Sequence, residues 1–307
     1  MRIFRNSKGL MRKTKAAVVT LGNFDGVHLG HQRILRKVRE RAASLGASSV
    51  VYTFEPHPLK VVAPHKSPPL ILDTEDKARI VEALGIDYMV VASFTKEFAS
   101  RHPREFVEEE IRPIAAEVCV GHDFSFGRGK EGTAEYLKEL GAELGFRVHV
   151  IPAYKKGAEV VSSSRIRRLI MEGDVRKAAL LLGRPFAIKG RVVRGQTMGR
   201  EIGFPTANIR QEGELVPGDG VYAAFAFAGK TRHRAVVNIG MAPTFGGRER
   251  SVEVHMLGFS ENIYGKRVRV EFVRRLRGEK AFASCEALKR QIRLDIKRAE
   301  RILSAGC

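Results

Sequence analysis

The sequence predicts two domains of different fold class: an α/β domain built on a parallel sheet, then an antiparallel β-rich domain with a closing helix. In the first half, apolar strand-like segments alternate with helix-like segments, which is the pattern of a parallel sheet covered by helices. In the second half, β-rich runs are separated by turns with glycine and proline, as in an antiparallel barrel or sandwich. Near the end of the chain, apolar residues recur at helical spacing.

The first domain is expected to contain five strands and several helices. Its predicted strands are residues 16–21, 49–54, 88–94, 117–120 and 147–152. Helical patterns lie between several of them, including one that starts at His28 and one over residues 133–144. Two short helical patterns, 165–172 and 175–182, then precede Gly183-Arg184-Pro185, where the character of the sequence changes. We therefore expect domains over residues 1–183 and 184–307.

The second domain is expected to be mostly β-structure. Its predicted strands are residues 186–193, 221–228, 232–239, 251–259 and 266–276. The closing helix, over roughly residues 284–303, places one apolar stripe on Leu288, Ile292, Ile296, Ala299 and Ile302/Leu303. This stripe predicts that the helix packs against the β-structure.

Charge and cysteine content narrow the possible ligands and the compartment. The chain has 54 Lys+Arg against 34 Asp+Glu, a net charge of +20, which favours anionic ligands. Nucleic acid, nucleotides and acidic membranes all fit that charge, but the basic residues are scattered and there is no Trp, so we favour nucleotide sites. The three cysteines are far apart, and no signal-peptide or membrane-spanning segment is evident. We expect a soluble, cytoplasmic protein.

The first candidate site is Gly22-Asn23-Phe24-Asp25-Gly26-Val27-His28-Leu29-Gly30-His31, which follows an apolar run and opens a helical pattern. His28 and His31 are three residues apart, so they project from one face if the first turn is helical. Two imidazoles beside the N–H groups of a helix start favour a phosphate ligand. Tight packing of the turn would explain some of the glycines but not both histidines. Such a site suits nucleotidyl transfer, which needs stabilisation of charge on phosphorus and pyrophosphate.

Three further segments are candidates for the same site. Ser162-Ser163-Ser164-Arg165-Ile166-Arg167 places hydroxyls and arginines at a predicted helix start, although the serines could simply cap that helix. Asp123 and Phe124 follow a strand and are candidates for ligand contact. His57 also follows a strand and could reach the site, or its segment could be a turn stiffened by two prolines.

Two other segments match phosphate-binding motifs only in part. Gly127-Arg128-Gly129-Lys130-Glu131-Gly132 matches GxGxxG but does not directly follow a buried strand, so we predict a substrate or nucleotide loop rather than a dinucleotide-binding turn. Gly229-Lys230-Thr231 lacks the leading glycine of a phosphate loop, because Ala224 stands there. We predict a hairpin turn at that position.

The second candidate site begins with a glycine-rich segment. Gly195, Gly199 and Gly203 suit a flap whose backbone approaches phosphates. Thr206 and Asn208 face the same side of an extended segment, and their neutral oxygens suit Mg²⁺ shared with nucleotide phosphates.

Glu253 is the candidate base of this second site. It shares one face of an alternating strand with His255, opposite the apolar side chains, and its carboxylate could take a proton from an alcohol. The alternative is that Glu253 lies on an ordinary exposed face of a barrel strand.

Taken together, these motifs resemble the bacterial bifunctional riboflavin kinase/FMN adenylyltransferase, or FAD synthetase, family over nearly the whole chain. The first half resembles the family in residues 22–31, 53–58, 120–127 and 162–167. The second half resembles it in residues 199–208, 217–222, 238–245 and 252–255. The HxGH turn alone occurs in many nucleotidyltransferases and some tRNA synthetases, whereas the order of all these motifs is far more specific. The folds implied are a Rossmann-like nucleotidyltransferase domain and a six-stranded Greek-key β-barrel with a C-terminal helix.

The resemblance also implies roles for individual residues. In adenylyl transfer, His28, His31 and Arg167 would be catalytic, and the residues that bind ATP would be Gly22, Asn23, Phe24, Asp25, Gly26, His28, His31, Asp123, Ser163, Ser164 and Arg167. The family's familiar motif has Thr where this chain has Ser164; because a hydroxyl is kept, we expect activity to be kept.

In the kinase, the resemblance implies that Glu253 activates the 5′-hydroxyl of riboflavin. Gly195, Gly199, Thr206 and Asn208 would bind ATP, with Thr206 and Asn208 also holding Mg²⁺. The flavin would lie near Asn238, Pro243, Thr244 and Phe245.

We therefore expect an enzyme that phosphorylates riboflavin to FMN and adenylylates FMN to FAD, with ATP as co-substrate and release of pyrophosphate. We expect no nucleic-acid or membrane partner, and the oligomeric state stays open. Two alternatives are a nucleotidyltransferase acting on another phosphorylated substrate and an RNA-binding module on a nucleotidyltransferase-like fold. The constellation of glycines, Thr206 and Asn208 argues against the second, since a binder driven by charge has no need of it.

Overall fold

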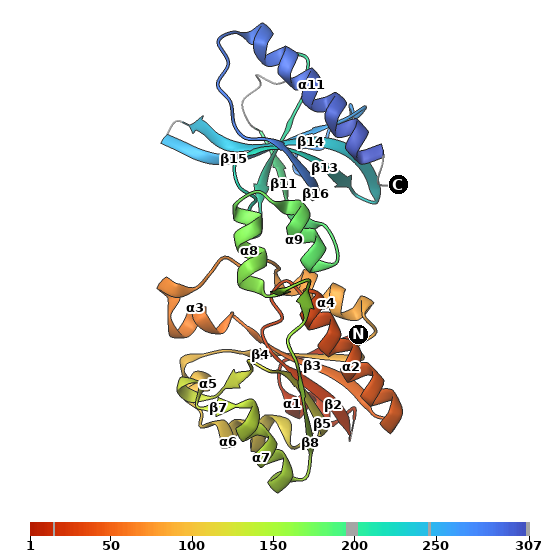
Figure 1. Ribbon diagram of the computed structural model, residues 1–307, viewed down its shortest axis with the longest axis vertical. Helices are drawn as coiled ribbons and strands as arrows, with labels where there is room; N and C mark the ends of the chain where they lie inside the picture. The colour runs from red at the N-terminus through yellow and green to blue at the C-terminus, as the bar shows by residue number, and fades with distance from the viewer. Residues whose placement is uncertain (15, 195–201, 245–246, 305–307) are drawn as a thin grey trace. The chain divides into compact units, whose positions relative to one another are not determined.

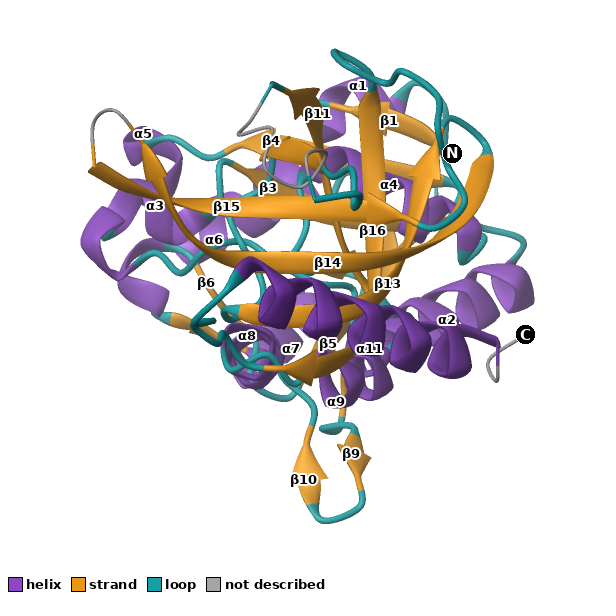
Figure 2. Cartoon of the chain, turned by 90° about the horizontal axis from the view of Figure 1, so that it is seen from above, coloured by secondary structure: helices purple, strands orange, loops and turns teal. Residues whose placement is uncertain are grey.

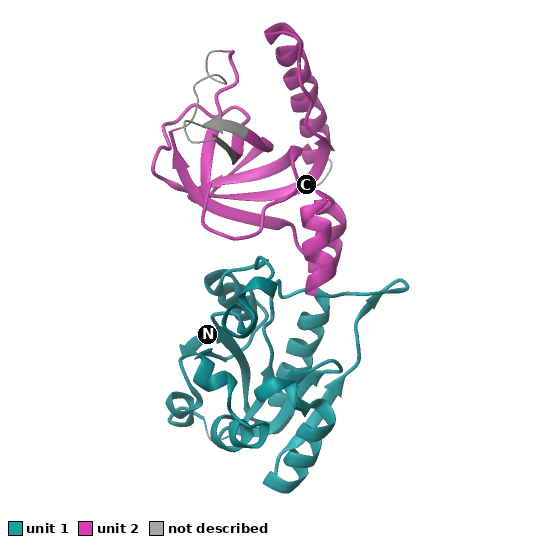
Figure 3. Ribbon diagram, turned by 90° about the vertical axis from the view of Figure 1, so that its left-hand side faces the viewer, with its two compact units in different colours: residues 1–162 teal, residues 163–307 magenta. Residues whose placement is uncertain are grey.

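The computed structural model describes residues 1–14, 16–194, 202–244 and 247–304, without the side chains of 242–249. By its internal contacts the chain divides into two compact units, Met1–Ser162 and Ser163–Cys307 (Figure 3). This division precedes the sequence-predicted boundary at residue 183, and the two short helices between these points are counted with the second unit.

The first unit contains a six-stranded parallel sheet (Figure 1). Its strands, in spatial order, are β1 (Arg2–Phe4), β4 (Tyr88–Ser93), β3 (Ser48–Glu55), β2 (Ala17–Leu21), β5 (Ala115–Gly121) and β8 (Arg147–Ile151). Two small hairpins accompany the sheet: β6 (Ser125–Phe126) with β7 (Gly132–Thr133), and β9 (Lys155–Lys156) with β10 (Glu159–Val160). The predicted parallel sheet is confirmed, and β1 is an edge strand that the apolar pattern did not predict.

The helices of the first unit connect these strands. They are α1 (Ser7–Met11), α2 (Leu29–Leu45), α3 (Pro58–Val62), α4 (Thr74–Ala83), α5 (Lys96–Ala99), α6 (Pro103–Phe106) and α7 (Ala134–Leu144), with short turns η1 (Pro64–Lys66), η2 (Val107–Ile111) and η3 (Arg128–Lys130). Alternate residues of β2 supply the two cores: Val19 packs with the α7 side, and Val18 packs with α2 and α4. Burial on both faces explains why the strand is apolar at successive positions.

The chain order of the strands locates the place where a ligand is expected to bind. From β2 the chain passes to β3 and β4 on one side, and later to β5 and β8 on the other. The direction in which the chain adds strands therefore reverses between the neighbouring strands β2 and β5, which form the switch point of the sheet. Ligands of open parallel sheets bind outside the carboxyl ends of the strands at such a point. The Gly22–His31 segment lies there, because it directly follows β2.

The second unit is a closed antiparallel barrel with a long helix on its outside. Its strands, in spatial order, are β11 (Phe186–Val193), β12 (Ala207–Gln211), β15 (Gly247–Met256), β14 (Thr231–Thr244), β13 (Gly220–Ala228) and β16 (Arg267–Arg277). Figure 2 shows α11 (Cys285–Ser304) along strands β13 and β14, which it contacts. The predicted six-stranded barrel and closing helix are confirmed.

Alternation along the barrel strands separates its interior from the face under α11. Val221, Ala223 and Val236 pack with Ala299 and Leu303 of α11, so they point outward. Their neighbours Tyr222 and Val237 are opposite each other and fully buried, so they point inward. Because side chains alternate along a strand, every second residue of β13, β14 and β15 points to the outer face and the residues between them point inward.

Two helices precede the barrel within the second unit. They are α8 (Ser163–Met171) and α9 (Val175–Leu182). α9 packs against β16 and β11, and α8 packs against α9. Within the described residues, no helix is both long and apolar enough to cross a membrane.

Candidate active sites

The turn between β2 and α2 is held in an unusual backbone conformation. Phe24 and Val27 have φ of 48° and 38°, values that side-chain-bearing residues rarely adopt, and Gly26 has φ of 84°. Phe24 is 2% exposed and Asp25 is 4% exposed. The Asp25 carboxylate accepts hydrogen bonds from the backbone N–H groups of Ile71 (3.0 Å) and Leu72 (3.2 Å). The buried side chains of Phe24 and Asp25 therefore fix the turn.

The two histidines lie together at the start of α2, as the spacing predicted. Their rings stack with centroids 3.6 Å apart and planes at 15°. His28 is the N-cap of α2 rather than its first helical residue, and its Nδ1 accepts the N–H of His31 at 3.3 Å. Because Nδ1 is an acceptor, the proton of the neutral His28 ring is on Nε2, which is then a donor suited to a phosphate oxygen.

Gly30, between the two histidines, lies close to the His28 ring. A Cβ at this position would lie 3.1 Å from both Cε1 and Nδ1 of the His28 ring, and 3.6 Å from the Cβ of Tyr154. The glycine therefore allows the His28 ring to lie over the first turn of the helix.

The neighbouring strand ends supply other side chains at the same edge of the sheet. The Asp123 carboxylate, just beyond β5, is 84% exposed and lies 3.8 Å from Nδ1 of His122. Phe124 instead stacks on Phe126 at 5.4 Å and packs against the core. His57 is the N-cap of α3, where its Nδ1 accepts the N–H of Leu59 at 3.2 Å. Of these residues, Asp123 is the most exposed to a ligand.

The serine–arginine motif opens α8 in the second unit. Ser163 and Ser164 are its first residues, and Arg167 is 9% exposed one turn later. These residues belong to a different compact unit from the histidines, so their joint action stays a prediction.

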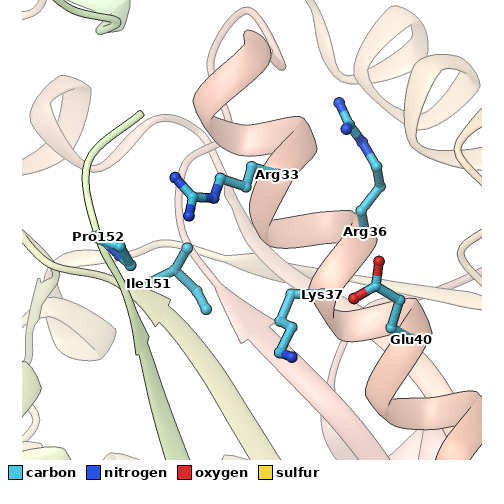
Figure 4. Close-up of a pocket in the computed structure, with 6 residues that line it drawn as sticks. All are labelled: Arg33, Arg36, Lys37, Glu40, Ile151 and Pro152. Carbon is cyan, nitrogen blue, oxygen red and sulfur yellow. The ribbon is translucent and has the colours of Figure 1, made fainter. Parts of the chain in front are cut away.

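A cavity of about 320 Å³ lies beside α2 in the first unit (Figure 4). It is lined by Arg33, Arg36, Lys37, Glu40, Ile151 and Pro152. In Figure 4, Arg33 extends from α2 toward Pro152, just past the end of β8. None of the sequence-predicted site residues lines this basic cavity.

In the barrel, strand pairing aligns three predicted residues in one row. Asn208 of β12 is opposite Glu253 of β15, and Glu253 is opposite Asn238 of β14. Opposite residues in an antiparallel sheet share a face, with Cβ atoms about 5 Å apart. Asn238 also pairs with Val221, which faces α11, so the whole row lies on the outer face of the barrel.

Glu253 is half-buried between two buried neighbours on β15. Its neighbours Val252 and Val254 are buried, at 4% and 1% exposed, whereas Glu253 is half-buried. Burial raises the pKa of the Glu253 carboxyl above its ordinary value. No hydrogen bond or ion pair to this side chain is present within the part of the chain that the structure describes. A raised pKa makes the carboxylate a better proton acceptor.

His255 contributes a contact that the sequence did not reveal. Its Nδ1 lies 2.8 Å from the carbonyl oxygen of Pro205, and its ring meets Phe204 edge-on at 6.0 Å. The residue therefore anchors the backbone directly before Thr206. The sequence showed only that His255 shares a face with Glu253; the contact depends on how the 204–208 segment folds back onto β15.

Some predicted residues are only partly described. Gly195, Gly199 and Phe245 lie outside the described residues, and Pro243 and Thr244 are described only as backbone at the end of β14. The predicted hairpin turn is confirmed, since Ala228 pairs with Thr231 across Gly229 and Lys230.

The GxGxxG segment also has a definite structure. It forms the loop of the β6–β7 hairpin, where Phe126 pairs with Gly132. This placement agrees with rejecting a dinucleotide-binding turn, which would directly follow a buried strand.

Comparison with known proteins assigns a family to each half of the chain. Residues 10–165 match the family model of FAD synthetase, and residues 182–303 match that of riboflavin kinase. The bifunctional riboflavin kinase/FMN adenylyltransferase of Escherichia coli (strain K12) is 35% identical over 96% of this chain and 96% of that protein. The protein of the same name from Bacillus subtilis (strain 168) is 36% identical over 94% and 93%.

A solved structure matches almost the full chain. It comes from Streptococcus pneumoniae, is named a macrolide-efflux protein, and is 30% identical, with a TM-score of 0.86 over 97% of this chain and 98% of that one. The two-part fold is therefore shared over the full length of a known structure.

Proposed function

We propose which residues carry the two reactions of this chain, which belongs to the bifunctional riboflavin kinase/FMN adenylyltransferase family. The chain is an enzyme of flavin cofactor biosynthesis that uses ATP, with its FAD synthetase part first and its riboflavin kinase part second. The observation that carries the residue assignment is that each part has its own polar constellation: the stacked histidines in the first, and the Asn208–Glu253–Asn238 row in the second.

In adenylyl transfer, a phosphate oxygen of FMN attacks the α-phosphorus of ATP, and the bond to pyrophosphate breaks. The attacking group is already an anion, so the reaction needs stabilisation of charge rather than a base. His28 and His31 donate to the triphosphate from the start of α2, where backbone N–H groups also attract anions. The family resemblance assigns Ser163, Ser164 and Arg167, in the first turns of α8, to the phosphates and Asp123 to the nucleotide.

In riboflavin phosphorylation, Glu253 takes the proton from the 5′-hydroxyl as its oxygen attacks the γ-phosphorus of ATP, and ADP leaves. The half-buried position and raised pKa of Glu253 support this role. Asn238 lies beside Glu253 in the row, which supports its assignment to the alcohol substrate. The segment 243–245 and the glycines at 195 and 199 are assigned to flavin and ATP by family resemblance.

The donor set of the barrel fits Mg²⁺ bound together with nucleotide phosphates. No group of three or more His, Cys, Asp or Glu that could hold a metal ion exists among the described residues. Thr206 and Asn208 offer neutral oxygens, which suit a Mg²⁺ ion whose charge is balanced by phosphates. When bound, the ion would neutralise negative charge on the phosphates, while Thr206 and Asn208 orient it.

The location of the enzyme is inferred from its thiols. Cys119 and Cys285 are free, and Cys119 is buried. Free thiols fit a reducing compartment, so we assign the activity to the cytoplasm.

The test supplies the full chain with riboflavin and MgATP and separates the flavins by chromatography with mass detection. Wild type should form FMN and then FAD. The His28→Ala/His31→Ala variant should accumulate FMN, because the kinase does not use these side chains. Glu253→Ala should form no FMN from riboflavin, yet convert added FMN to FAD.

Matched controls separate these roles from general damage. His65→Ala changes an exposed histidine of the first unit, and Glu271→Ala changes a glutamate of another barrel strand; both should keep the two activities. If a histidine variant and Glu253→Ala each lost both steps while remaining folded, the assignment of the histidines to one reaction and of Glu253 to the other would be wrong.

A further inference from the structure

Lys77 is a buried cation that has no assigned role in either reaction. It lies in the first half of α4 and is only 7% exposed. Its ammonium donates to the hydroxyl of Thr53 at 3.4 Å, and within the described residues it has no carboxylate partner at ion-pair distance. Burial of a charge without a close partner is costly, so such a residue needs a reason.

Other charged side chains of this chain that are as deeply buried have close partners. Glu117 accepts two hydrogen bonds from Arg41, at 2.8 and 2.7 Å, and lies 2.9 Å from His149. Asp295 is bound by Arg277 at 2.9 Å. Lys77 instead has only longer-range attraction from Asp25 and Glu55, which opposes the lowering of its pKa by burial. Both of these carboxylates are at the carboxyl edge of the sheet.

A chain of hydrogen bonds connects Lys77 to the histidine turn. The Thr53 hydroxyl that accepts from Lys77 donates its own proton to the carbonyl oxygen of Asn23, at 3.3 Å. A hydroxyl has one proton to donate, so the ammonium on one side fixes its direction toward Asn23 on the other. Helix α4, strand β3 and the turn are thus joined through one side chain.

Asp25 connects the same two regions a second time. Its buried carboxylate accepts the N–H groups of Ile71 and Leu72, which precede α4. The Lys77 ammonium supplies positive charge to this carboxylate. Asp25 and Asn23 are both in the turn that leads to His28, so both connections act on the position of the paired imidazoles.

We propose that Lys77 is a positioning residue for adenylyl transfer: through Thr53 and Asp25 it holds the turn in the conformation that presents His28 and His31 to the triphosphate. Lys77 does not touch substrate in this role. The proposal rests on the function assigned to the two histidines. Loss of Lys77 should therefore slow adenylyl transfer and leave riboflavin phosphorylation unchanged, because the kinase reaction in the barrel does not depend on this turn.

The test uses Lys77→Met in the full chain, since methionine keeps most of the length and removes the charge. We expect kcat/KM for FAD formation from added FMN to fall about 10- to 100-fold, the effect of a small misplacement of catalytic groups. Riboflavin phosphorylation in the same preparation should stay within about twofold, and serves as a measure of intact protein. ATP binding, measured by calorimetry on the same samples, should weaken in the first unit.

The matched control is Arg41→Met, which removes the cation beside another buried carboxylate of the same unit, Glu117. This contact lies on the second half of α2, away from its first turn. Arg41→Met should lower the melting temperature without lowering kcat/KM of the folded enzyme. An equal loss of adenylyl transfer in both variants would show that Lys77 is merely structural, which overturns the proposal.

Thr53→Val gives a second route that keeps the lysine, in case Lys77→Met fails to fold. It removes the linking hydroxyl at nearly constant volume and should also slow adenylyl transfer. Residues acting through one connection are not additive, so the double variant should be no slower than Lys77→Met alone. The proposal would be overturned if the double variant lost the product of the two single fold-changes. It would also be overturned if Lys77→Met formed FAD at a rate within twofold of wild type. A wild type that forms no FAD from FMN would instead refute the proposed function.

Discussion

The ionised form of Glu253 that is needed for activity is also the form that lowers the stability of the fold. Burial raises its pKa, so its folded-state value lies above the unfolded one. The sign follows: the stabilising contribution of such an acid is present below the unfolded pKa and is lost as the pH rises through the folded pKa. At neutral pH the ionised carboxylate therefore destabilises the folded barrel, and it is the ionised form that acts as a base.

This conflict predicts that Glu253→Gln stabilises the protein while it abolishes riboflavin phosphorylation. The melting temperature at pH 8 should rise by about 2–4 °C, the effect of a modest gain in a unit of this size. Below the ordinary glutamate pKa of about 4.3, the difference from wild type should vanish, because the carboxyl is then neutral in both states. Thermal unfolding at both pH values checks this; an unchanged or lower melting temperature at pH 8 would contradict it.

His255 is the second residue whose role can be separated from that of its neighbours. Its Nδ1 contact to the carbonyl oxygen of Pro205 holds the segment that leads to Thr206. His255→Phe keeps a ring beside Phe204 and loses the hydrogen bond, so kcat/KM for MgATP in the kinase should fall about 3- to 10-fold. His255→Asn places an amide donor near the same atom and should recover most of the loss.

Steady-state kinetics of the two His255 variants, with adenylyl transfer as the internal control, decide this prediction. Equal activity of the Phe and Asn variants would mean that the hydrogen bond does not position the segment. A loss of adenylyl transfer would mean that the change affects more than the barrel.

At the scale of elements, Gly30 in the first turn of α2 lowers the stability of the helix and leaves room for the ring of His28. Alanine is a better helix former than glycine by about 0.5–1 kcal/mol, so propensity alone favours Gly30→Ala. The added Cβ would lie 3.1 Å from two atoms of the His28 ring, which must then shift. We expect Gly30→Ala to melt at the same or a higher temperature and to lose adenylyl transfer.

Ser44→Ala, on the last turn of the same helix, is the control for Gly30→Ala and should leave both activities unchanged. Melting curves and FAD formation from FMN are the measurements. Full activity of the Gly30→Ala enzyme would show that the His28 ring can move without consequence.

Elements were predictable from the sequence where burial is continuous or strictly periodic. All five residues of β2 are buried, and α2 buries Leu35, Val38 and Ala42 at helical spacing. β1 and β12 lack such signals: β1 buries none of its three residues, and β12 buries only Ile209. Their positions come from pairing with distant strands, which no local pattern contains.

In the candidate sites too, local contacts could be predicted from the sequence and contacts between distant segments could not. The spacing of His28 and His31 predicted that their rings lie together, because that contact is local. The alignment of Asn208, Glu253 and Asn238 depends on the register of three strands, and the burial of Lys77 depends on how α4 packs. Within the charged run at the start of α4, nothing distinguishes Lys77 from a solvated residue.

For the whole molecule, the contacts of α8 and α9 within the second unit bear on where one folding unit ends and the next begins. The N–H of Gly218 in the barrel donates to the carbonyl oxygen of Ile170 at 3.0 Å, and Arg275 donates to that of Glu172 at 3.4 Å. A Cβ at Gly218 would lie 2.4 Å from the carbonyl oxygen of Met171, so the two chain segments are in close contact. Cutting at residue 183 would remove these contacts.

Two fragments, 163–307 and 184–307, test which boundary the chain uses. In the shorter fragment, β11 and β16 lose the cover of α9, whose buried residues are Val175, Ala178, Leu181 and Leu182. Each buried Val or Leu side chain is worth about 1.5–3 kcal/mol, so the shorter fragment should melt at least about 10 °C lower. Both should phosphorylate riboflavin when folded, since every residue assigned to the kinase follows residue 184. Equal melting temperatures would instead place the boundary at residue 183, with α8 and α9 belonging to the first domain.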